Sequence, residues 1–352
     1  MRPRQRVRAA MSAITCALGP DSAGTLLMRL LGRARRSIDA AVYEVGPSYR
    51  WALVRAAERG LRVRLVLDAH VSDGNAATAR ALIDAGAGCR VAGVGADAAH
   101  GKLLIVDGTF AVGSGNLLWR DAPRDPHLRL PPAGPPLAGT REWWVTVAHA
   151  RRLHRSADDA FEAHWATATA PPAGWAVASD VTAPAVGIPM PQVAPKLLCA
   201  PSGRLALVIG GAAVGEALGD LVSAARRRVL VTVPYAHPRA LPVREVLDLI
   251  AEASSRRVAC ALLLGAIPDP KEVDLLAALP FPVRRMDPAR STSGHAKGLV
   301  ADGAVLVSSA NWSQAGLGGN WEAALWIDHP GAAAYYAAAW RRDWETSLAI
   351  DV

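Results

Sequence analysis

Apolar positions along the chain follow two spacings, one helical and one continuous, that alternate through the first half. Apolar side chains recur at helical spacing in three segments, residues 22–36, 49–59 and 75–85. Short, nearly continuous apolar runs separate or follow them at residues 37–43, 61–67 and 89–93. Helices alternating with buried strands are typical of a mostly parallel sheet with helices on both faces. An α/β fold is predicted.

The second half of the chain repeats this order. RARRSIDAAVYEV (33–45) parallels AARRRVLVTVPYA (224–236), which places Tyr43 opposite Tyr235. In each half an amphipathic helix and a buried strand come next. Self-similarity over this length marks an internal duplication. We therefore expect two tandem α/β repeats that pack as a pseudo-dimer.

Each repeat contains one hairpin with the same polar residues. HGKLLIVDGTFAVGSGN (100–116) matches HAKGLVADGAVLVSSAN (295–311) without a gap. Asp-Gly between apolar runs signals a two-residue hairpin turn. On a strand, side chains two residues apart project from one face. Each hairpin thus carries an imidazole, an ammonium, a hydroxyl and an amide on one side: His100, Lys102, Ser114 and Asn116, then His295, Lys297, Ser309 and Asn311.

Two kinds of acidic residue accompany these hairpins. Asp107 and Asp302 stand at the turns, where they are expected to stabilise the hairpin or pair with a neighbour. Glu142 in REWWV and Glu322 in NWEAALW follow further along each repeat. These glutamates are expected to hydrogen-bond the imidazoles and fix their tautomers, as the third member of a catalytic triad does.

These residues resemble the phospholipase D superfamily, whose mark is two His-x-Lys-x(4)-Asp motifs, each followed by a Gly/Ser-rich turn and an Asn. The resemblance covers roughly residues 25–345. It implies a phosphodiesterase in which one histidine forms a phosphohistidine and the other is the general acid and base. It suggests His100 as nucleophile and His295 as acid and base, although the sequence alone does not distinguish them.

The residue types fit this chemistry without a metal or cofactor. Lys102 and Lys297, with the amides of Asn116 and Asn311, can hold the charge of a phosphodiester. Ser114 and Ser309 are expected to add hydroxyl donors to the phosphate. The duplication supplies both motifs in one chain, so an oligomer is not required.

Charge indicates an anionic partner. The chain has 352 residues, is 51% hydrophobic and 20% charged, and carries a net charge of +8. Such a composition is globular, and the basic charge suits nucleic acid or acidic lipid. Four cysteines without a CxxC pair, Cys16, Cys89, Cys199 and Cys260, indicate reduced, structural thiols.

The expected substrate is nucleic acid. SSANWSQAGLGGNWE (308–322) looks more like the motif of bacterial nuclease-type members than that of the lipid synthases, and arginine clusters are available to contact phosphates. The alternative is phospholipid hydrolysis or phosphatidyl transfer of the cardiolipin synthase kind. A non-catalytic anion-binding module is a minor alternative, since both motifs are intact.

The domain boundaries follow from composition. Residues 1–165 are predicted to form the first repeat, 166–203 a Pro/Ala-rich linker, and 204–352 the second repeat. A Pro- and Gly-rich loop is expected at 121–140. Helices are predicted at 151–165, closing the first repeat, and at 331–348, closing the second.

The amino terminus has four arginines within its first eight residues, followed by a short apolar run at 9–18. This resembles a signal peptide only faintly, because no small-residue cleavage site follows. No segment reaches the roughly 18 apolar residues of a membrane span. We expect a cytoplasmic protein without an integral membrane anchor, with secretion as the alternative.

Two other features have both a functional and a structural interpretation. Asp68, His70 and Asp73 resemble metal ligands, but the second half repeats no such histidine, which favours a structural loop. Aromatic residues are frequent after Glu142 and in the last helix, where packing in the core is favoured over a stacking surface; they are Trp143, Trp144, Tyr335, Tyr336, Trp340 and Trp344.

Overall fold

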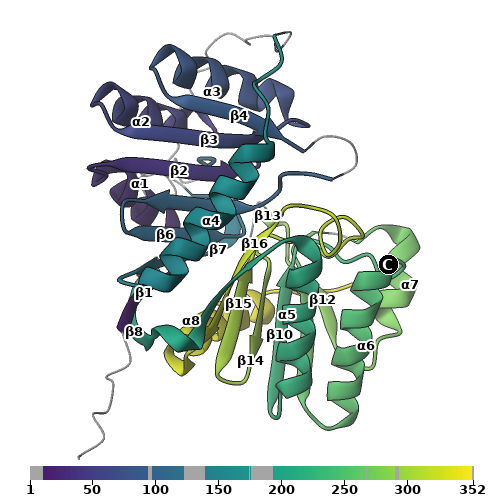
Figure 1. Ribbon diagram of the computed structural model, residues 1–352. Helices are drawn as coiled ribbons and strands as arrows, with labels where there is room; N and C mark the ends of the chain where they lie inside the picture. The colour runs from purple at the N-terminus through teal and green to yellow at the C-terminus, as the bar shows by residue number, and fades with distance from the viewer. Residues whose placement is uncertain are drawn as a thin grey trace, which may run out of the picture.

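The protein consists of two mixed β-sheets with their flanking helices, as a computed structural model shows (Figure 1). The structure describes residues 11–93, 97–122, 139–173, 175, 193–266, 268–289 and 293–350. The arginines near the amino terminus, most of the 121–140 loop and much of the 166–203 segment lie outside the described residues.

Strand order is the same in the two sheets over seven strands. The first sheet runs β4-β3-β2-β5-β6-β7-β1-β8, with β13 joining β7, and the second runs β17-β12-β11-β10-β14-β15-β16-β9. The strands of the first sheet are β1 (Met11–Gly19), β2 (Ser37–Val42), β3 (Arg62–Asp68), β4 (Gly88–Ala92), β5 (Lys102–Val106), β6 (Thr109–Gly113), β7 (Thr140–Ala148), β8 (Lys196–Pro201) and β13 (Ser293–Gly294). Those of the second are β9 (Leu205–Ile209), β10 (Arg228–Val233), β11 (Ala259–Leu264), β12 (Val283–Arg285), β14 (Gly298–Ala301), β15 (Ala304–Ser308), β16 (Ala323–Asp328) and β17 (Leu348–Ala349).

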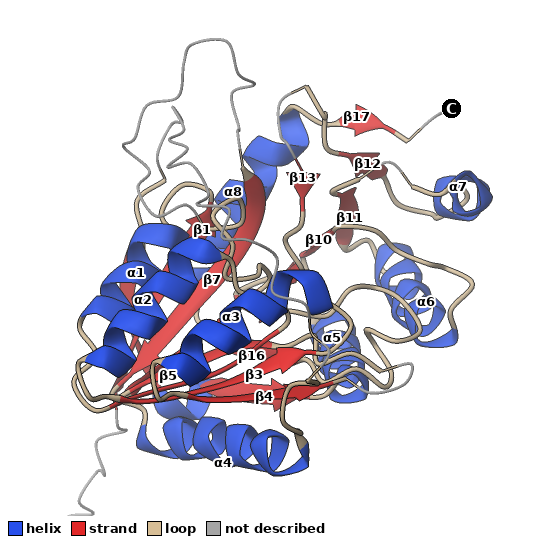
Figure 2. Cartoon of the chain, turned by 90° about the horizontal axis from the view of Figure 1, so that it is seen from above, coloured by secondary structure: helices blue, strands red, loops and turns tan. Residues whose placement is uncertain are grey.

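The helices cover both faces of the first sheet, with α1, α2 and α3 on one face and α4 on the other (Figure 2). They are α1 (Ala23–Gly32), α2 (Pro47–Glu58), α3 (Ser72–Asp84), α4 (Arg151–Thr167), α5 (Gly211–Ala224), α6 (Leu241–Ser255), α7 (Pro270–Ala277) and α8 (Pro330–Glu345), with a 3₁₀ turn at Ser202–Arg204. All five predicted helices are present, shifted at their ends by a few residues. Within the described part of the chain, no helix has the length and apolar character needed to cross a membrane.

One hydrophobic core joins the two repeats. It contains apolar side chains from both sheets together with those of α4 and α8, and separate cores lie under α1–α3 and under α5–α6. Trp143, Trp144 and Tyr336 are fully buried, and Tyr335 and Trp340 are nearly so. The packing interpretation of these aromatic residues is therefore confirmed.

Three details differ from the sequence-based expectations. In each sheet three neighbouring strands pair in parallel (β2–β4 and β10–β12); the short strand β13 also pairs in parallel with β7, and the remaining strand pairs are antiparallel. The hairpins account for this, because a short turn can join only antiparallel strands. The apolar run near the amino terminus forms β1, which pairs with β7 and β8. Residues 196–201, expected in the linker, form β8 in the first sheet.

Candidate active site

The two predicted motifs begin at equivalent places in the two sheets. Lys102 is the first residue of β5, and Lys297 directly precedes β14. These strands lie beside the parallel strands β2 and β10, respectively, in the middle of each sheet. Each histidine therefore stands in the loop that enters a central, buried strand.

The Asp-Gly turns are held to the neighbouring strand by carboxylates. Asp107 accepts hydrogen bonds from the backbone amides of Arg35, Arg36 and Ser37 at 2.9–3.0 Å. Asp302 accepts from the amides of residues 226–228 at 2.8–3.0 Å. Both aspartates have positive φ, 52° and 47°, as the tight turn requires. Their role is structural, and they lie at the far end of each hairpin from the histidine.

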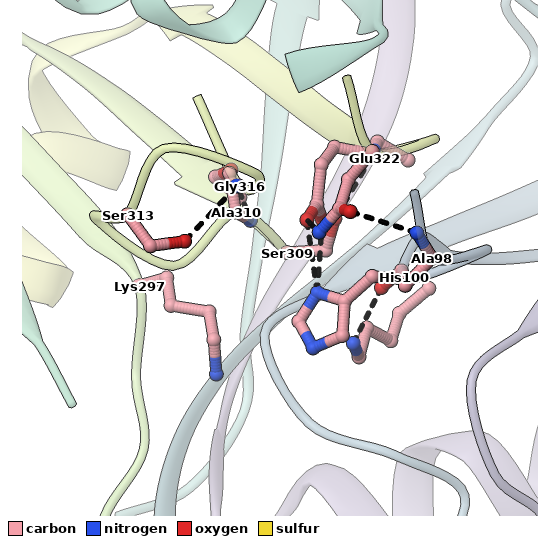
Figure 3. A network of polar contacts seen from close by, with 12 residues as sticks. Ala98, His100, Lys297, Ser309, Ala310, Ser313, Gly316 and Glu322 are labelled. Atoms are coloured by element: carbon pink, nitrogen blue, oxygen red, sulfur yellow. Dashed lines mark hydrogen bonds and ion pairs between the residues drawn. The ribbon is translucent and has the colours of Figure 1, made fainter. Parts of the chain in front are cut away.

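The histidines pair with glutamates across the repeats. His100 Nδ1 lies 3.0 Å from Oε1 of Glu322, which belongs to the second repeat (Figure 3). His295 Nδ1 lies 2.7 Å from Oε1 of Glu142, which belongs to the first. Both glutamates are fully buried. The site is therefore complete only when the two halves are together.

These pairings fix the imidazole tautomers. A carboxylate can only accept a hydrogen bond, so each Nδ1 carries a proton and donates a hydrogen bond to the glutamate. In a neutral ring the lone pair is then on Nε2. Burial, with a contribution from Lys102, lowers the pKa of His100 to about 4 in spite of Glu322. Burial and Lys297 also lower the pKa of His295. Burial opposes ionisation of Glu322, but His100 outweighs it and the pKa of this carboxyl is lowered.

The lysines are buried and turned back on the chain. Lys102 Nζ donates to the carbonyl of His100, and its charge lies 5.3 Å from the centre of the Tyr43 ring. Lys297 Nζ donates to the carbonyls of His295 at 2.7 Å and of Ser114, in the other repeat, at 3.2 Å. Burial lowers the pKa of Lys102 to about 7 and that of Lys297 to about 8.

The two asparagines present amides that the protein leaves partly unused. Asn116 is buried and Asn311 is partly buried, and among the described residues neither Oδ1 has a hydrogen-bond partner. Buried polar groups are normally paired. An unpaired amide oxygen is an acceptor, so each Oδ1 can receive a hydrogen bond from a hydroxyl group, whereas the Nδ2 group of each amide is the part that can donate to an anion.

The two motif serines contact the glutamates. Ser114 Oγ donates to Glu142 and accepts from the Trp143 amide at 2.9 Å. Ser309 Oγ donates to Glu322 and accepts from the Ala323 amide at 2.9 Å. A hydroxyl has one proton to donate. Because that proton goes to a glutamate, the serines position the carboxylates in this structure, and a contact between their hydroxyl groups and a phosphate stays a prediction.

Two further side chains hold the His100 loop, and neither was predicted as a site residue. Asp68 is buried and accepts from the amide of Ala99 at 2.6 Å. Asn320 accepts from the amide of Ala98 at 2.8 Å and donates to Glu322 Oε1 at 3.1 Å. The available signal for Asp68 was its place after a buried parallel strand, where functional residues gather.

The cluster of Asp68, His70 and Asp73 has a structural explanation. Asp68 accepts hydrogen bonds from His70 as well as from Ala99. The described residues contain no group of three or more His, Cys, Asp or Glu placed to hold a metal ion. The favoured interpretation of this segment as a structural loop agrees with these contacts.

The sequence profile described as "Cardiolipin synthase, PLD-like domain" matches residues 27–124 and 218–344, one segment in each repeat. The chain is a member of the phospholipase D superfamily. No curated protein sequence matches it significantly. The superfamily consists of phosphodiesterases and phosphotransferases, so the match supports enzymatic activity in general terms.

Solved structures show the same fold at low identity. Phosphatidylserine synthase from Haemophilus influenzae matches with 12% identity and a TM-score of 0.65, covering 95% of this chain and 87% of that one. Polyphosphate kinase from Porphyromonas gingivalis matches with 16% identity and a TM-score of 0.57; 94% of this chain is covered, but it spans only half of the kinase. Nuc from Salmonella typhimurium, a phospholipase D family member, matches with 16% identity and a TM-score of 0.36, covering 41% of this chain and 97% of Nuc.

Proposed function

We propose that this protein is a phosphodiesterase that cleaves nucleic acid through a phosphohistidine intermediate and without a metal. The observation that carries the proposal is the crossed pair of histidines. Each imidazole has its Nδ1 bound to a buried glutamate, which leaves the lone pair of the neutral ring on Nε2; at His295, Lys297 Nζ lies 2.9 Å from that Nε2. Two ammonium groups and two asparagine amides accompany them.

In the first step Nε2 of His100 attacks phosphorus, and the P–O bond to the leaving alcohol breaks. Lys102, Lys297 and the asparagine amides hold the non-bridging oxygens, whose charge they offset. The His100 ring becomes positive as the P–N bond forms, and Glu322 stabilises that charge. His295, protonated at Nε2, donates its proton to the leaving oxygen.

The second step reverses these roles. Neutral His295 takes a proton from water, the water oxygen bonds to phosphorus, and the P–N bond to His100 breaks. The products are a phosphate monoester and an alcohol, and both histidines return to their initial states. The lowered pKa of His100 suits this cycle, because His100 must be neutral to attack.

Three observations support nucleic acid as the substrate. The chain carries a net charge of +8. Arg120 stands at the site with more than half of its side chain exposed. Among the described residues, no helix carries more than one large exposed apolar side chain, whereas an amphipathic helix that binds a lipid surface presents several on one face.

Not every arginine cluster supports this substrate. Residues 33–36 and 226–228 lie beside the Asp107 and Asp302 turns. Each turn aspartate is seven residues from its histidine, about 23 Å along the strand at about 3.3 Å per residue. Arg284 donates to the carbonyl of Ser347 and lies over Trp344. The arginine support for nucleic acid therefore comes from Arg120, beside the overall charge and the distribution of exposed apolar side chains.

Phospholipid is the second candidate substrate. It is favoured by the matching profile, which is described as that of cardiolipin synthase, and by the likeness of the whole fold to phosphatidylserine synthase. The same two-step chemistry would transfer a phosphatidyl group to an alcohol or to water.

The test is cleavage of labelled single-stranded DNA, duplex DNA and RNA in excess EDTA, comparing the unmodified protein with His100→Ala and His295→Ala. We expect cleavage that survives EDTA and is lost in each variant. If the unmodified protein cleaves nothing and the histidine variants still bind nucleic acid, the protein is a binding module instead. If no nucleic acid is cleaved, turnover of phosphatidylglycerol with an alcohol acceptor would assign the protein to lipids.

A further inference from the structure

A polar cavity of about 350 Å³ opens beside His295. Every residue that lines it has a polar side chain: Asn116, Arg120, Asp121, Thr140, Ser293 and His295. A cavity with this lining, next to one catalytic imidazole, suits a small group that forms several hydrogen bonds.

Asp121 is the unusual member of this lining. It is only 3% exposed, and its Oδ2 accepts from the backbone amide of Asn116 at 2.9 Å. Burial and the nearby Glu142 raise the pKa of Asp121 to about 7, so near neutral pH it exists both as an acceptor and as a donor. The second repeat offers no counterpart, because the residue five positions after Asn311 is Gly316. Asp121 therefore distinguishes the two sides of a pseudo-symmetric site.

A cavity lined in part by Ala98 and Ala99, the two residues before His100, has a different character. Its volume is about 270 Å³, and Val91, Ala92, Ala99 and Trp321 contribute apolar surface to it. His164 stacks on Trp321 there, with ring centres 4.2 Å apart.

We propose that the cavity beside His295 is the subsite for the alcohol arm of the substrate, and that Asp121 and Thr140 bind a second hydroxyl group on that arm. The ligand class is a polyhydroxylated alcohol, such as a sugar or glycerol. The assignment rests on the proposed function, in which His295 protonates the leaving oxygen. Proton transfer requires hydrogen-bond contact, so the group attached to that oxygen lies on the His295 side.

The same subsite serves an incoming alcohol in the second step. The alcohol oxygen gives its proton to His295 and bonds to phosphorus as the P–N bond to His100 breaks. The phosphohistidine therefore partitions between water and any alcohol that the cavity holds. This partition is a ratio of products formed by the same active molecules, so it does not depend on how much of a variant is folded.

The experiment uses thymidine 5′-(p-nitrophenyl phosphate) with the full-length protein in excess EDTA and equal concentrations of glycerol and 1-propanol. Release of p-nitrophenolate reports the first step, and chromatography gives the ratio of glyceryl to propyl ester. Glycerol has three hydroxyl groups, so chance alone gives a ratio of about three. We expect a ratio of about ten or more, since an added hydrogen bond is typically worth several-fold in such a competition.

Asp121→Ala and Thr140→Val are each expected to lower that ratio towards three. Asp97→Ala, which removes a carboxylate from the cavity near His100, should leave it unchanged. A ratio near three in the unmodified protein, or a high ratio that neither variant lowers, would overturn the subsite. Absence of any His100-dependent p-nitrophenolate release would instead overturn the two-histidine chemistry itself, and the subsite with it.

Discussion

Individual residues set the protonation states on which the proposed reaction depends. Burial lowers the pKa of His100 to about 4, and that of His295 also falls below the ordinary 6.5. The ring of His295 is the more open of the two, with 26% of its side chain exposed against 10% for His100. His100, the nucleophile, must be neutral, and His295, the acid, must be protonated. Both conditions hold only above the pKa of His100 and below the pKa of His295.

The rate should therefore peak on the acid side of neutrality. We expect kcat/KM to fall below about pH 4, where His100 becomes protonated, and to fall again before pH 6.5, where His295 loses its proton. A pH profile of p-nitrophenolate release in EDTA measures both limbs. A maximum above pH 8 would contradict the assignment, because Lys102 and Lys297 would by then be losing their charge as well.

Glu322 is predicted to act on His100 although 222 positions separate them. Glu322→Gln removes the charge that stabilises the His100 imidazolium, and we expect kcat to fall by roughly 10²–10⁴-fold, as for loss of a triad carboxylate. Glu216→Gln on the exposed face of α5 is the matched control and should leave kcat unchanged. Circular dichroism should be the same for both variants; unaltered kcat in Glu322→Gln would refute the role.

The site residues were predictable from the sequence to different degrees. Two gapless copies of His-x-Lys-x(4)-Asp located the histidines, lysines and turn aspartates. The crossed pairing of Glu142 with His295 was not predictable, because it depends on how two separate sheets pack. The contacts of the serines with the glutamates were not predictable for a similar reason: the spacing of the serines gives the face of the strand, whereas the glutamate that accepts their hydrogen bond comes from another part of the chain.

At the scale of elements, the hairpins and their aspartate anchors give the motif strands their positions. Asp107→Ala removes three amide–carboxylate hydrogen bonds, and Asp302→Ala removes the equivalent three. We expect each substitution to lower the free energy of unfolding by about 1–3 kcal/mol. The two sites lie in separate repeats, so the double variant should show the sum. Urea unfolding at pH 7 measures these values.

The pH dependence of that stabilisation has a definite sign. Burial opposes ionisation of Asp107, but the backbone amides outweigh it and lower the pKa of the carboxyl below its ordinary 3.8. The contribution to stability is therefore complete above pH 3.8 and is lost as the pH falls through the lowered pKa. The gap in stability between Asp107→Ala and the unmodified protein should shrink in acid; a constant gap would show that the charge is irrelevant.

Elements near the ends of the repeats were harder to predict than the hairpins. The run at 9–18 is short and apolar, which fits a signal segment as well as a strand. It forms β1 because β7 and β8 supply hydrogen-bond partners from distant parts of the chain. β8 itself carries several exposed side chains and has no apolar periodicity, so pairing with β1 determines its conformation.

Across the whole molecule, side chains of one repeat fill the space left by glycines of the other. Trp143 in β7 lies directly against Gly298 at the start of β14, and Trp321 lies against Gly101 inside the first motif. Arg141 also joins the repeats, through ion pairs with Asp21 at 2.7 Å and with Asp343 in α8 at 3.0 Å. These contacts hold the two motif strands at the separation that the crossed His–Glu pairs need.

Gly298→Ala is predicted to disturb the site from a distance. An added methyl group would collide with the buried ring of Trp143, the neighbour of Glu142, and would push the two sheets apart. We expect the free energy of unfolding to fall by about 1–3 kcal/mol, as is usual for overpacking. Since Glu142 pairs with His295, kcat should fall as well.

Gly303→Ala is the matched control, because a Cβ there meets no atom within 4 Å and the change should cost less than about 0.5 kcal/mol. Urea unfolding and kcat measured on the same samples test both effects. If Gly298→Ala proved as stable and as active as Gly303→Ala, close packing of Trp143 on Gly298 would not be needed to position the crossed His–Glu pairs.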